Sequence, residues 1–222
     1  MSTNKEWLSI SDMMSGLMMV FLFIAVAFML DADKDKKQVT NIAKTYSETT
    51  LALNKALRDE FSTEELQGWG AEILEDNTIR FKEPKTLFNR ASANLKRKFQ
   101  VILDSFFVRY VKVLTNPRFK ADILELRIEG HTSPVGRYSG DSPQDAYLYN
   151  AELSQKRALS VLMHVFKVPQ VKESQKWLEG VLRANGLSYS RQLETFEQSR
   201  RVEFRVIVNT EDKIKQILKL DK

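Results

Sequence analysis

The sequence predicts an α+β protein in which a single membrane-spanning helix precedes one polar domain. Two observations predict it: residues 13–30 are 18 consecutive residues without a charge, and the rest of the chain alternates between helical and strand patterns. At about 1.5 Å rise per residue, such a stretch spans about 27 Å, close to the roughly 30 Å hydrocarbon core of a bilayer. The length of 222 residues fits one domain with such an appendage.

Residues 7–30 are predicted as the complete membrane span, with Trp7 at the interface. A cleavable signal peptide is an alternative, since Ala25-Val26-Ala27 resembles a cleavage site, but the start is barely basic and the apolar run continues past it. A buried core helix is the other alternative, and a run of this length that is apolar on all faces argues against it.

Asp12 lies about 7–8 Å inside Trp7 along the helix axis. A carboxylate there either marks the membrane edge or faces a partner helix and carries ions. A charge at the centre of a membrane helix costs about 2.5–3.5 kcal/mol, and less near an interface. Ser15 and Gly16, one turn later, would let another backbone approach that face.

Charge is divided unevenly along the chain. The 34 Lys+Arg and 29 Asp+Glu give a net charge of +5; residues 1–30 hold Lys5, Glu6 and Asp12, a net −1, so the remainder carries +6. Basic residues follow the span at 34–37, and counting them would place the body in the cytoplasm. A basic body also admits nucleic-acid binding, although a solvated charged face is the commoner explanation.

Catalytic and metal-binding patterns are missing from the sequence. The chain has no Cys, which excludes disulfides, thiolate metal sites and a thiol nucleophile. His131 and His164 lie 33 residues apart without metal-ligand spacing, and no phosphate-binding loop or nucleophile elbow occurs. We therefore expect neither an enzyme nor a bound metal or cofactor.

Residues 33–67 lack Pro and Gly and are predicted as a linker helix that ends at Gly68-Trp69-Gly70. Its apolar positions recur every three or four residues, which suits pairing with a second copy of the helix. These positions are Val39, Ile42, Tyr46, Thr49 and Leu53.

Beyond residue 70, apolar periodicity predicts three strands and three helices, with the helices on one side of a small mixed sheet. Strands are expected at 78–81, 123–129 and 201–209, with a turn at Pro84 after the first. Helices are expected at 95–113, 150–165 and 172–184, and a long loop at 130–146.

Two stretches resemble known families. Residues 7–22, WLSISDMMSGLMMVFL, resemble the transmembrane helix of flagellar stator B subunits. The sequence around Asp12 is most similar to that of motor B subunits of Zorya anti-phage defence systems. Three later motifs resemble the OmpA-like peptidoglycan-binding domain. They are Gly130-His131-Thr132, the set Asn150, Leu153, Ser154, Arg157 and Ala158, and Arg200-Arg201-Val202-Glu203.

The resemblance implies residues 1–6 as a short cytoplasmic N-terminus, 7–30 as a transmembrane helix, 31–70 as a periplasmic linker helix and 71–222 as an OmpA-like peptidoglycan-binding domain. It implies an inner-membrane location with a periplasmic domain, against the charge count. It also implies a homodimer that works with polytopic A subunits, and Asp12 as the carrier of H⁺ in preference to Na⁺.

The implied peptidoglycan-binding residues are Ser133, Tyr149, Asn150, Leu153, Arg157 and Arg201. Arg157 would pair with a carboxylate of the peptide stem, while Tyr149 and Asn150 would supply a flat face and hydrogen bonds. A structural alternative is that Asn150 caps a helix and Leu153 is core. The family usually has Asp where this chain has Ser133, and Asp141 and Asp145 on the following loop are the candidates to replace its contact with the ligand's amine.

The sequence therefore predicts the B subunit of an ion-driven rotary motor in anti-phage defence. The alternatives are a flagellar-type stator B subunit, a passive membrane-tethered peptidoglycan anchor, and a cytosol-facing basic domain that binds nucleic acid.

Overall fold

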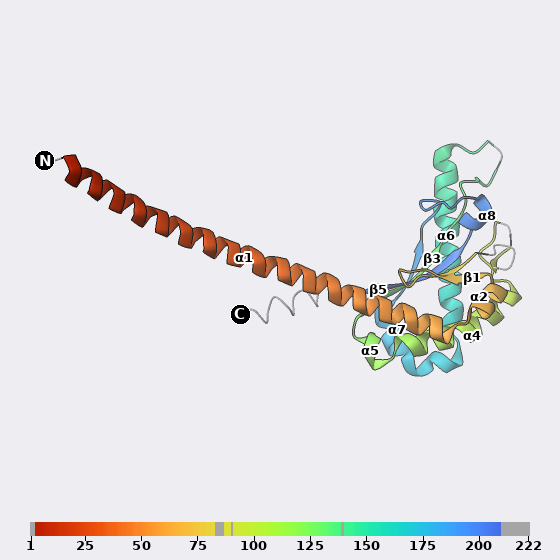
Figure 1. Cartoon of the computed structure of the whole chain (residues 1–222). Helices are drawn as coiled ribbons and strands as arrows, with labels where there is room; N and C mark the ends of the chain where they lie inside the picture. The colour runs from red at the N-terminus through yellow and green to blue at the C-terminus, as the bar shows by residue number, and fades with distance from the viewer. Residues whose placement is uncertain (1–2, 83–86, 90, 139, 210–222) are drawn as a thin grey trace. The chain divides into compact units, whose positions relative to one another are not determined.

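The computed structural model describes residues 3–82, 87–89, 91–138 and 140–209; within it, the side chains of residues 3–11, 38–39, 41–43 and 45–47 are not described. The predictions that concern Pro84, residues 210–222 and the side chains of Trp7, Val39, Ile42 and Tyr46 fall outside this description. The chain divides into two compact units, of which one begins at Met1 and runs to Thr45, and the other is Tyr46–Glu211. Figure 1 labels the elements along the chain.

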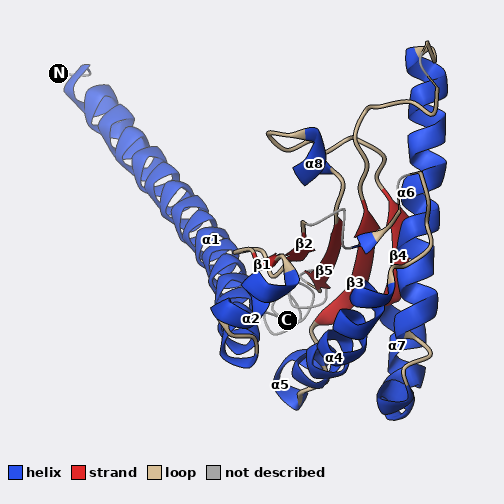
Figure 2. Cartoon of the chain, turned by 90° about the vertical axis from the view of Figure 1, so that its right-hand side faces the viewer, coloured by secondary structure: helices blue, strands red, loops and turns tan. Residues whose placement is uncertain are grey.

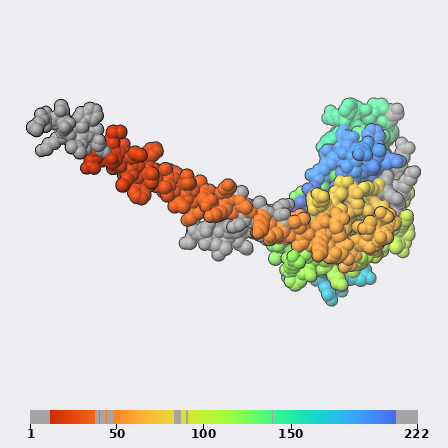
Figure 3. Space-filling view, in the orientation of Figure 1, coloured from red at the N-terminus to blue at the C-terminus, as the bar shows by residue number. Residues whose placement is uncertain are grey.

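Helix α1, Thr3–Glu60, is a single α-helix of 58 residues. By length and composition it is the one helix in the described part of the chain that could cross a membrane, over Asp12–Lys37. Every side chain from residue 12 to residue 37 is exposed, and Figure 3 draws this stretch in red to orange. The predicted apolar helix is therefore present, and it continues without a break into the predicted linker.

The predicted linker helix over 33–67 is wrong at its C-terminal end, because α1 stops at Glu60. A second helix, α2 (Thr63–Trp69), begins there: Ser62 is its N-cap, and its Oγ accepts the Glu65 N–H at 3.2 Å. The apolar positions Leu53, Leu57 and Phe61 are buried in the core of the domain, so Leu53 does not face a second copy. The chain leaves α2 at Gly70, whose φ of 66° suits a residue without Cβ.

Five strands form one mixed sheet in the order β1-β2-β5-β3-β4 (Figure 2). Among the strands of the described residues, β3 and β4 pair in parallel and the other neighbours pair antiparallel. The strands are β1 Ala71–Ile73, β2 Ile79–Phe81, β3 Ile123–Gly130, β4 Leu182–Gly186 and β5 Val202–Val208.

Three helices, α4, α6 and α7, lie on one face of this sheet (Figure 2), as predicted. An aromatic cluster fills the space between sheet and helices: Phe81, Phe106 and Phe204 are fully buried, with ring centroids 5.0–5.9 Å apart. The helical elements are α4 Arg97–Leu114, α5 Pro117–Lys120, α6 Pro143–Val165, η1 Pro169–Ser174, α7 Gln175–Val181 and α8 Phe196–Ser199.

Two glycines bring α6 close to the ends of the parallel strand pair. A Cβ on Gly130 would lie 2.3 Å from the Ser154 carbonyl oxygen, and one on Gly186 would lie 2.4 Å from the Gln155 nitrogen. Gly130 and Gly186 are also register partners in the sheet. This close approach places the loop that follows β3 beside the N-terminal half of α6.

Two predicted boundaries are wrong. Helix α6 begins at Pro143 rather than at Asn150, because Ser142 caps it and Pro143 occupies its first turn. The helix predicted over 172–184 ends at Val181, and residues 182–186 form β4 because they pair with β3. Strand β1 and the short helices α5 and α8 were not predicted from the sequence.

Candidate ligand-binding cleft

A cleft of about 530 Å³ opens in the domain where the loop after β3 faces α6. This volume suits a small ligand or a short segment of a polymer. Five of the six residues predicted to bind peptidoglycan line it. The lining residues are Phe88, Asn89, Ala91, Lys96, Thr132, Ser133, Val135, Gly136, Arg137, Tyr149, Asn150, Leu153, Arg157, Glu197 and Arg200.

Arg157 is a buried cation at this cleft, with 6% of its surface exposed. Its Nε donates to the Ser92 carbonyl at 3.0 Å, and its guanidinium lies 4.9 Å from the centre of the Phe88 ring. In the described part of the chain, no carboxylate lies within 4.0 Å of it. Burial lowers the pKa of Arg157 to about 10, an effect that Tyr149 opposes and Arg200 reinforces. The group therefore stays charged at neutral pH and lacks a counter-charge.

Asn150 and Leu153 reach the cleft from α6, on the same face of the helix as Arg157. Asn150 does not cap a helix, because it lies in the second turn of α6. Its Nδ2 donates to the carbonyl of Val135 at 3.0 Å and to that of Ala146 at 2.9 Å. Asn150 thus ties the loop to the helix and fixes the wall of the cleft. Tyr149 and Leu153, both half-buried, add aromatic and apolar surface.

Ser133 and Arg200 also line the cleft. Ser133 is 4% exposed, and Arg200 Nη1 lies 3.5 Å from its Oγ. Arg200 also lies 3.9 Å from the exposed carboxylate of Glu197. Arg200 was not predicted as a site residue, although it stands beside Arg201 in the same motif.

Arg201 is the predicted site residue that the structure does not bring to the cleft. It is 3% exposed, and its Nε donates to Glu203 Oε1 at 2.6 Å. The same oxygen accepts from Arg80 Nε at 2.7 Å. Burial would raise the pKa of Glu203, but its contacts with His131 and Arg201 outweigh burial and hold that pKa well below its usual range. Arg201 is thus part of a buried ion-pair network between strands β5 and β2.

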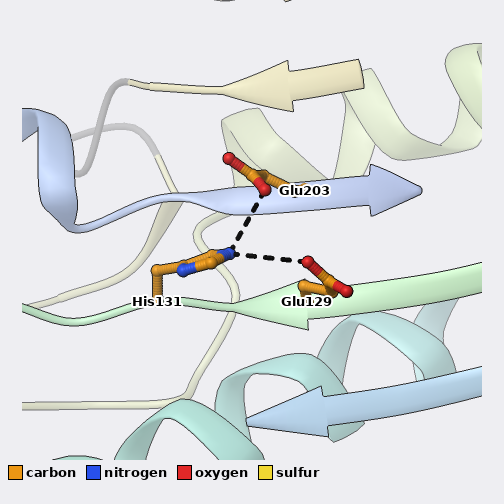
Figure 4. Close-up of side chains that lie close together, drawn as sticks. All are labelled: Glu129, His131 and Glu203. Carbon is orange, nitrogen blue, oxygen red and sulfur yellow. Dashed lines mark ion pairs between the residues drawn. The ribbon is translucent and has the colours of Figure 1, made fainter. Parts of the chain in front are cut away.

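Glu129, His131 and Glu203 converge at one end of this network (Figure 4). The His131 Nε2 lies 3.3 Å from Glu203 Oε2 and 3.9 Å from Glu129 Oε2, and burial lowers the His131 pKa. These are metal-ligand types that the spacing of residues along the sequence did not reveal. Three arginines already provide positive charge here: Arg80 and Arg201 on Glu203, and Arg191, whose Nη1 lies 3.5 Å from Glu129 Oε2. This balance favours an ion-pair network over a cation site.

Comparison with curated proteins decides the family. The Zorya protein ZorB of Escherichia coli strain Crooks is 40% identical over 223 aligned residues, which cover 97% of this chain and 93% of that protein. This chain belongs to the ZorB family. No protein-family model matches the chain.

The fold of this ZorB-family chain resembles that of a MotB-like protein from Desulfovibrio vulgaris, with a TM-score of 0.53 and 20% identity over 75% of this chain and 98% of that one. The periplasmic domain of Helicobacter pylori MotB also matches, with a TM-score of 0.46 and 17% identity over 68% of this chain and 97% of that one. The OmpA-like domain of FopA1 from Francisella tularensis matches with a TM-score of 0.40 and 21% identity over 62% of this chain and 80% of that one. The expected architecture, an apolar N-terminal helix before an α+β domain, is confirmed, and the domain shares its fold with the MotB-like protein.

The loop carboxylates of this ZorB-family chain do not replace the missing Asp at Ser133. Asp141 Oδ2 accepts the Tyr138 N–H at 2.9 Å, and Asp145 Oδ2 accepts the Ser142 hydroxyl at 2.6 Å. Neither residue lines the cleft. Both carboxylates therefore serve the loop and the start of α6.

Asp12 stands at the start of the apolar stretch of α1, with its side chain exposed. The residues three and four positions away are Leu8, Ser9, Ser15 and Gly16, and none of them is basic. Its own helix thus offers no counter-charge within one turn.

Proposed function

We propose that this ZorB-family chain is the ion-carrying, wall-anchored B subunit of a rotary motor in the inner membrane that acts in anti-phage defence. The observation that carries the proposal is that one chain holds both parts: a candidate membrane span of α1 that begins at Asp12, and a cationic cleft around Arg157. The 40% identity to a Zorya protein, against 20% to a MotB-like protein, favours defence over flagellar rotation.

In this proposal α1 crosses the inner membrane with its N-terminus in the cytoplasm, and the domain lies in the periplasm. Two copies of the chain stand inside a ring of polytopic A subunits. Each Asp12 carboxylate takes up an H⁺ and releases it to the other side, and the A subunits provide the polar surroundings that α1 lacks. The membrane potential supplies about 2.3 kcal/mol per charge for each 100 mV.

The cleft would hold the motor to the cell wall. Peptide stems of peptidoglycan carry carboxylates, and a guanidinium binds a carboxylate through two parallel hydrogen bonds. Arg157 has the charge and the unoccupied guanidinium edge for that contact, and Tyr149 and Asn150 complete the wall around it.

Substitution of Asp12 by Asn tests the motor. The amide keeps the size and removes the titratable proton, so we expect normal accumulation of the protein, no ion flux and no protection from phage in a plaque assay. Asp31→Asn, at the other end of the apolar run, is the matched control and should keep protection. A strain with Asp12→Asn that is still protected from phage would contradict the motor. It would favour the passive anchor, whose function does not depend on Asp12.

Cosedimentation with purified sacculi tests the anchor. The full chain in detergent micelles should pellet with sacculi, and Arg157→Met should reduce the bound fraction at least tenfold. Arg118, exposed on α5 and outside the cleft, provides the control variant Arg118→Met. Failure of the unmodified chain to pellet would count against both the motor anchor and the passive anchor.

A further inference from the structure

The charges around the cleft are almost all of one sign. Among the described lining residues, four are cationic and one is a carboxylate, Glu197. The Glu197 side chain is 69% exposed and belongs to an ion pair with Arg200. A ligand in the cleft therefore meets positive charge on several sides, and no buried carboxylate faces it. The cationic residues are Lys96, Arg137, Arg157 and Arg200.

Two separate places in the cleft are suited to a carboxylate. The first is Arg157, whose Nε is held by the Ser92 carbonyl and whose Nη1 and Nη2 make no hydrogen bond with the described residues. The second is the Ser133–Arg200 pair, where a hydroxyl donor and a guanidinium lie 3.5 Å apart. A carboxylate between them would accept from both groups.

The second place is unsuited to an ammonium group. Ser133 offers only a neutral hydroxyl oxygen, and the adjacent Arg200 repels a positive charge. Asp141, on the loop after β3, points its Oδ2 to the Tyr138 N–H instead, and the exposed carboxylate of Glu197 is already paired with Arg200.

We propose that the cleft recognises its ligand through two carboxylates, one at Arg157 and one at Ser133 and Arg200, and does not read the ligand's amino groups. The proposal rests on the proposed function, because it defines which groups of a peptidoglycan stem the chain binds. The ligand class is a dicarboxylate small enough to enter a cleft of about 530 Å³. The related domains usually have Asp at the position of Ser133, and Ser133 has no carboxylate that would select a ligand with an amino group.

Three small acids of similar length separate carboxylate recognition from amine recognition. Pimelate has two carboxylates and no amine, meso-diaminopimelate has both carboxylates and two amines, and lysine has two amines and one carboxylate. Each competes with sacculi for the full chain in detergent micelles, and the concentration that halves cosedimentation is measured. Sodium sulfate, with the same charge as pimelate, sets the level of non-specific screening.

We expect pimelate to compete within threefold of diaminopimelate, and lysine to be at least tenfold weaker than either. In Ser133→Asp the new carboxylate repels one end of pimelate and attracts an amine, so the ratio should shift at least tenfold towards diaminopimelate. Arg200→Gln should weaken pimelate and diaminopimelate to a similar extent, because both place a carboxylate at this residue, and it provides a second variant should Ser133→Asp fail to fold.

A tenfold preference of the unmodified chain for diaminopimelate over pimelate would overturn the proposal, and so would lysine as strong as pimelate or pimelate no stronger than sulfate. These results differ from a failure of the proposed function, in which the chain does not pellet with sacculi even without competitor.

Discussion

Two buried arginines of the domain, Arg157 and Arg201, have opposite surroundings. Arg201 is 3% exposed and donates to the Glu203 carboxylate at 2.6 Å. Arg157 is 6% exposed, donates to the Ser92 carbonyl and lies over the Phe88 ring, with no carboxylate nearby among the described residues. Burial of a cation without a counter-charge costs free energy. The difference is consistent with a structural role for Arg201 and with the proposed role of Arg157 in binding an external carboxylate.

The largest expected effect on stability comes from removing Arg201, the arginine that is paired with a carboxylate. Arg201→Met should lower the free energy of unfolding by about 3 kcal/mol, because it leaves the buried Glu203 with one guanidinium in place of two. Urea unfolding of the full chain in micelles measures this through the fluorescence of Trp69 and Trp177, which pack against the core.

The adjacent Arg200 is the matched control for this measurement. Its ion pair with Glu197 is long, at 3.9 Å, and partly exposed, so Arg200→Met should change the free energy of unfolding by less than about 1 kcal/mol. Equal effects at the two positions would remove the distinction between the network and the cleft.

The sequence motifs could not separate these roles. Arg200 and Arg201 are neighbours, and only the start of β5 at Val202 and the pairing of Glu203 with Arg80 determine which one turns inward. Helical spacing did place Asn150, Leu153 and Arg157 on one face of α6, and the structure brings them together. The contact between His131 and Glu203 depends on strand pairing across more than 70 residues, which local patterns do not encode.

The fold was predictable where a pattern was long. The apolar stretch, α4 and β3 repeat their periodicity over several turns or alternations, and all three are present. The errors lie where pairing with a distant strand determines the secondary structure. Residues 182–186 continue a helical pattern, yet they pair with β3 as a parallel strand. The start of α6 was missed although Ser142-Pro143 before Asp145 is a recognisable capping sequence.

A change of pH should have an intermediate effect on the free energy of unfolding, through His131, the neutral residue of the network. Burial lowers the pKa of His131, so in the folded chain it stays neutral at a pH where the unfolded chain protonates it. Its stabilising contribution is complete above about pH 6.5 and is lost as the pH falls towards the folded pKa, with a slope of at most about 1.4 kcal/mol per pH unit.

Around His131, the charges of Glu129, Glu203 and Arg201 contribute in opposite directions. The pKa of Glu203 is held down, so this carboxylate stays ionised in the folded chain between pH 5 and 6.5. Urea unfolding at several pH values should therefore show a slope in this window that His131→Gln reduces and His164→Gln preserves. An unchanged slope in His131→Gln would place the acid sensitivity outside the network.

The smallest effect on the free energy of unfolding is expected for substitution of Arg157, and this measurement decides whether Arg157 and Arg201 have different roles. Arg157→Met loses the hydrogen bond to Ser92 and the contact with Phe88, worth about 1 kcal/mol each, but it also removes a buried charge without a counter-charge. These terms oppose each other, so the free energy of unfolding should change by no more than about 1 kcal/mol while cosedimentation with sacculi is lost.

Arg157→Lys keeps the charge but lacks the planar guanidinium, so it should retain only part of the binding to sacculi. A loss of 3 kcal/mol or more in Arg157→Met would instead make this arginine a structural residue like Arg201, because a group reserved for an external carboxylate has little stability to contribute in its absence.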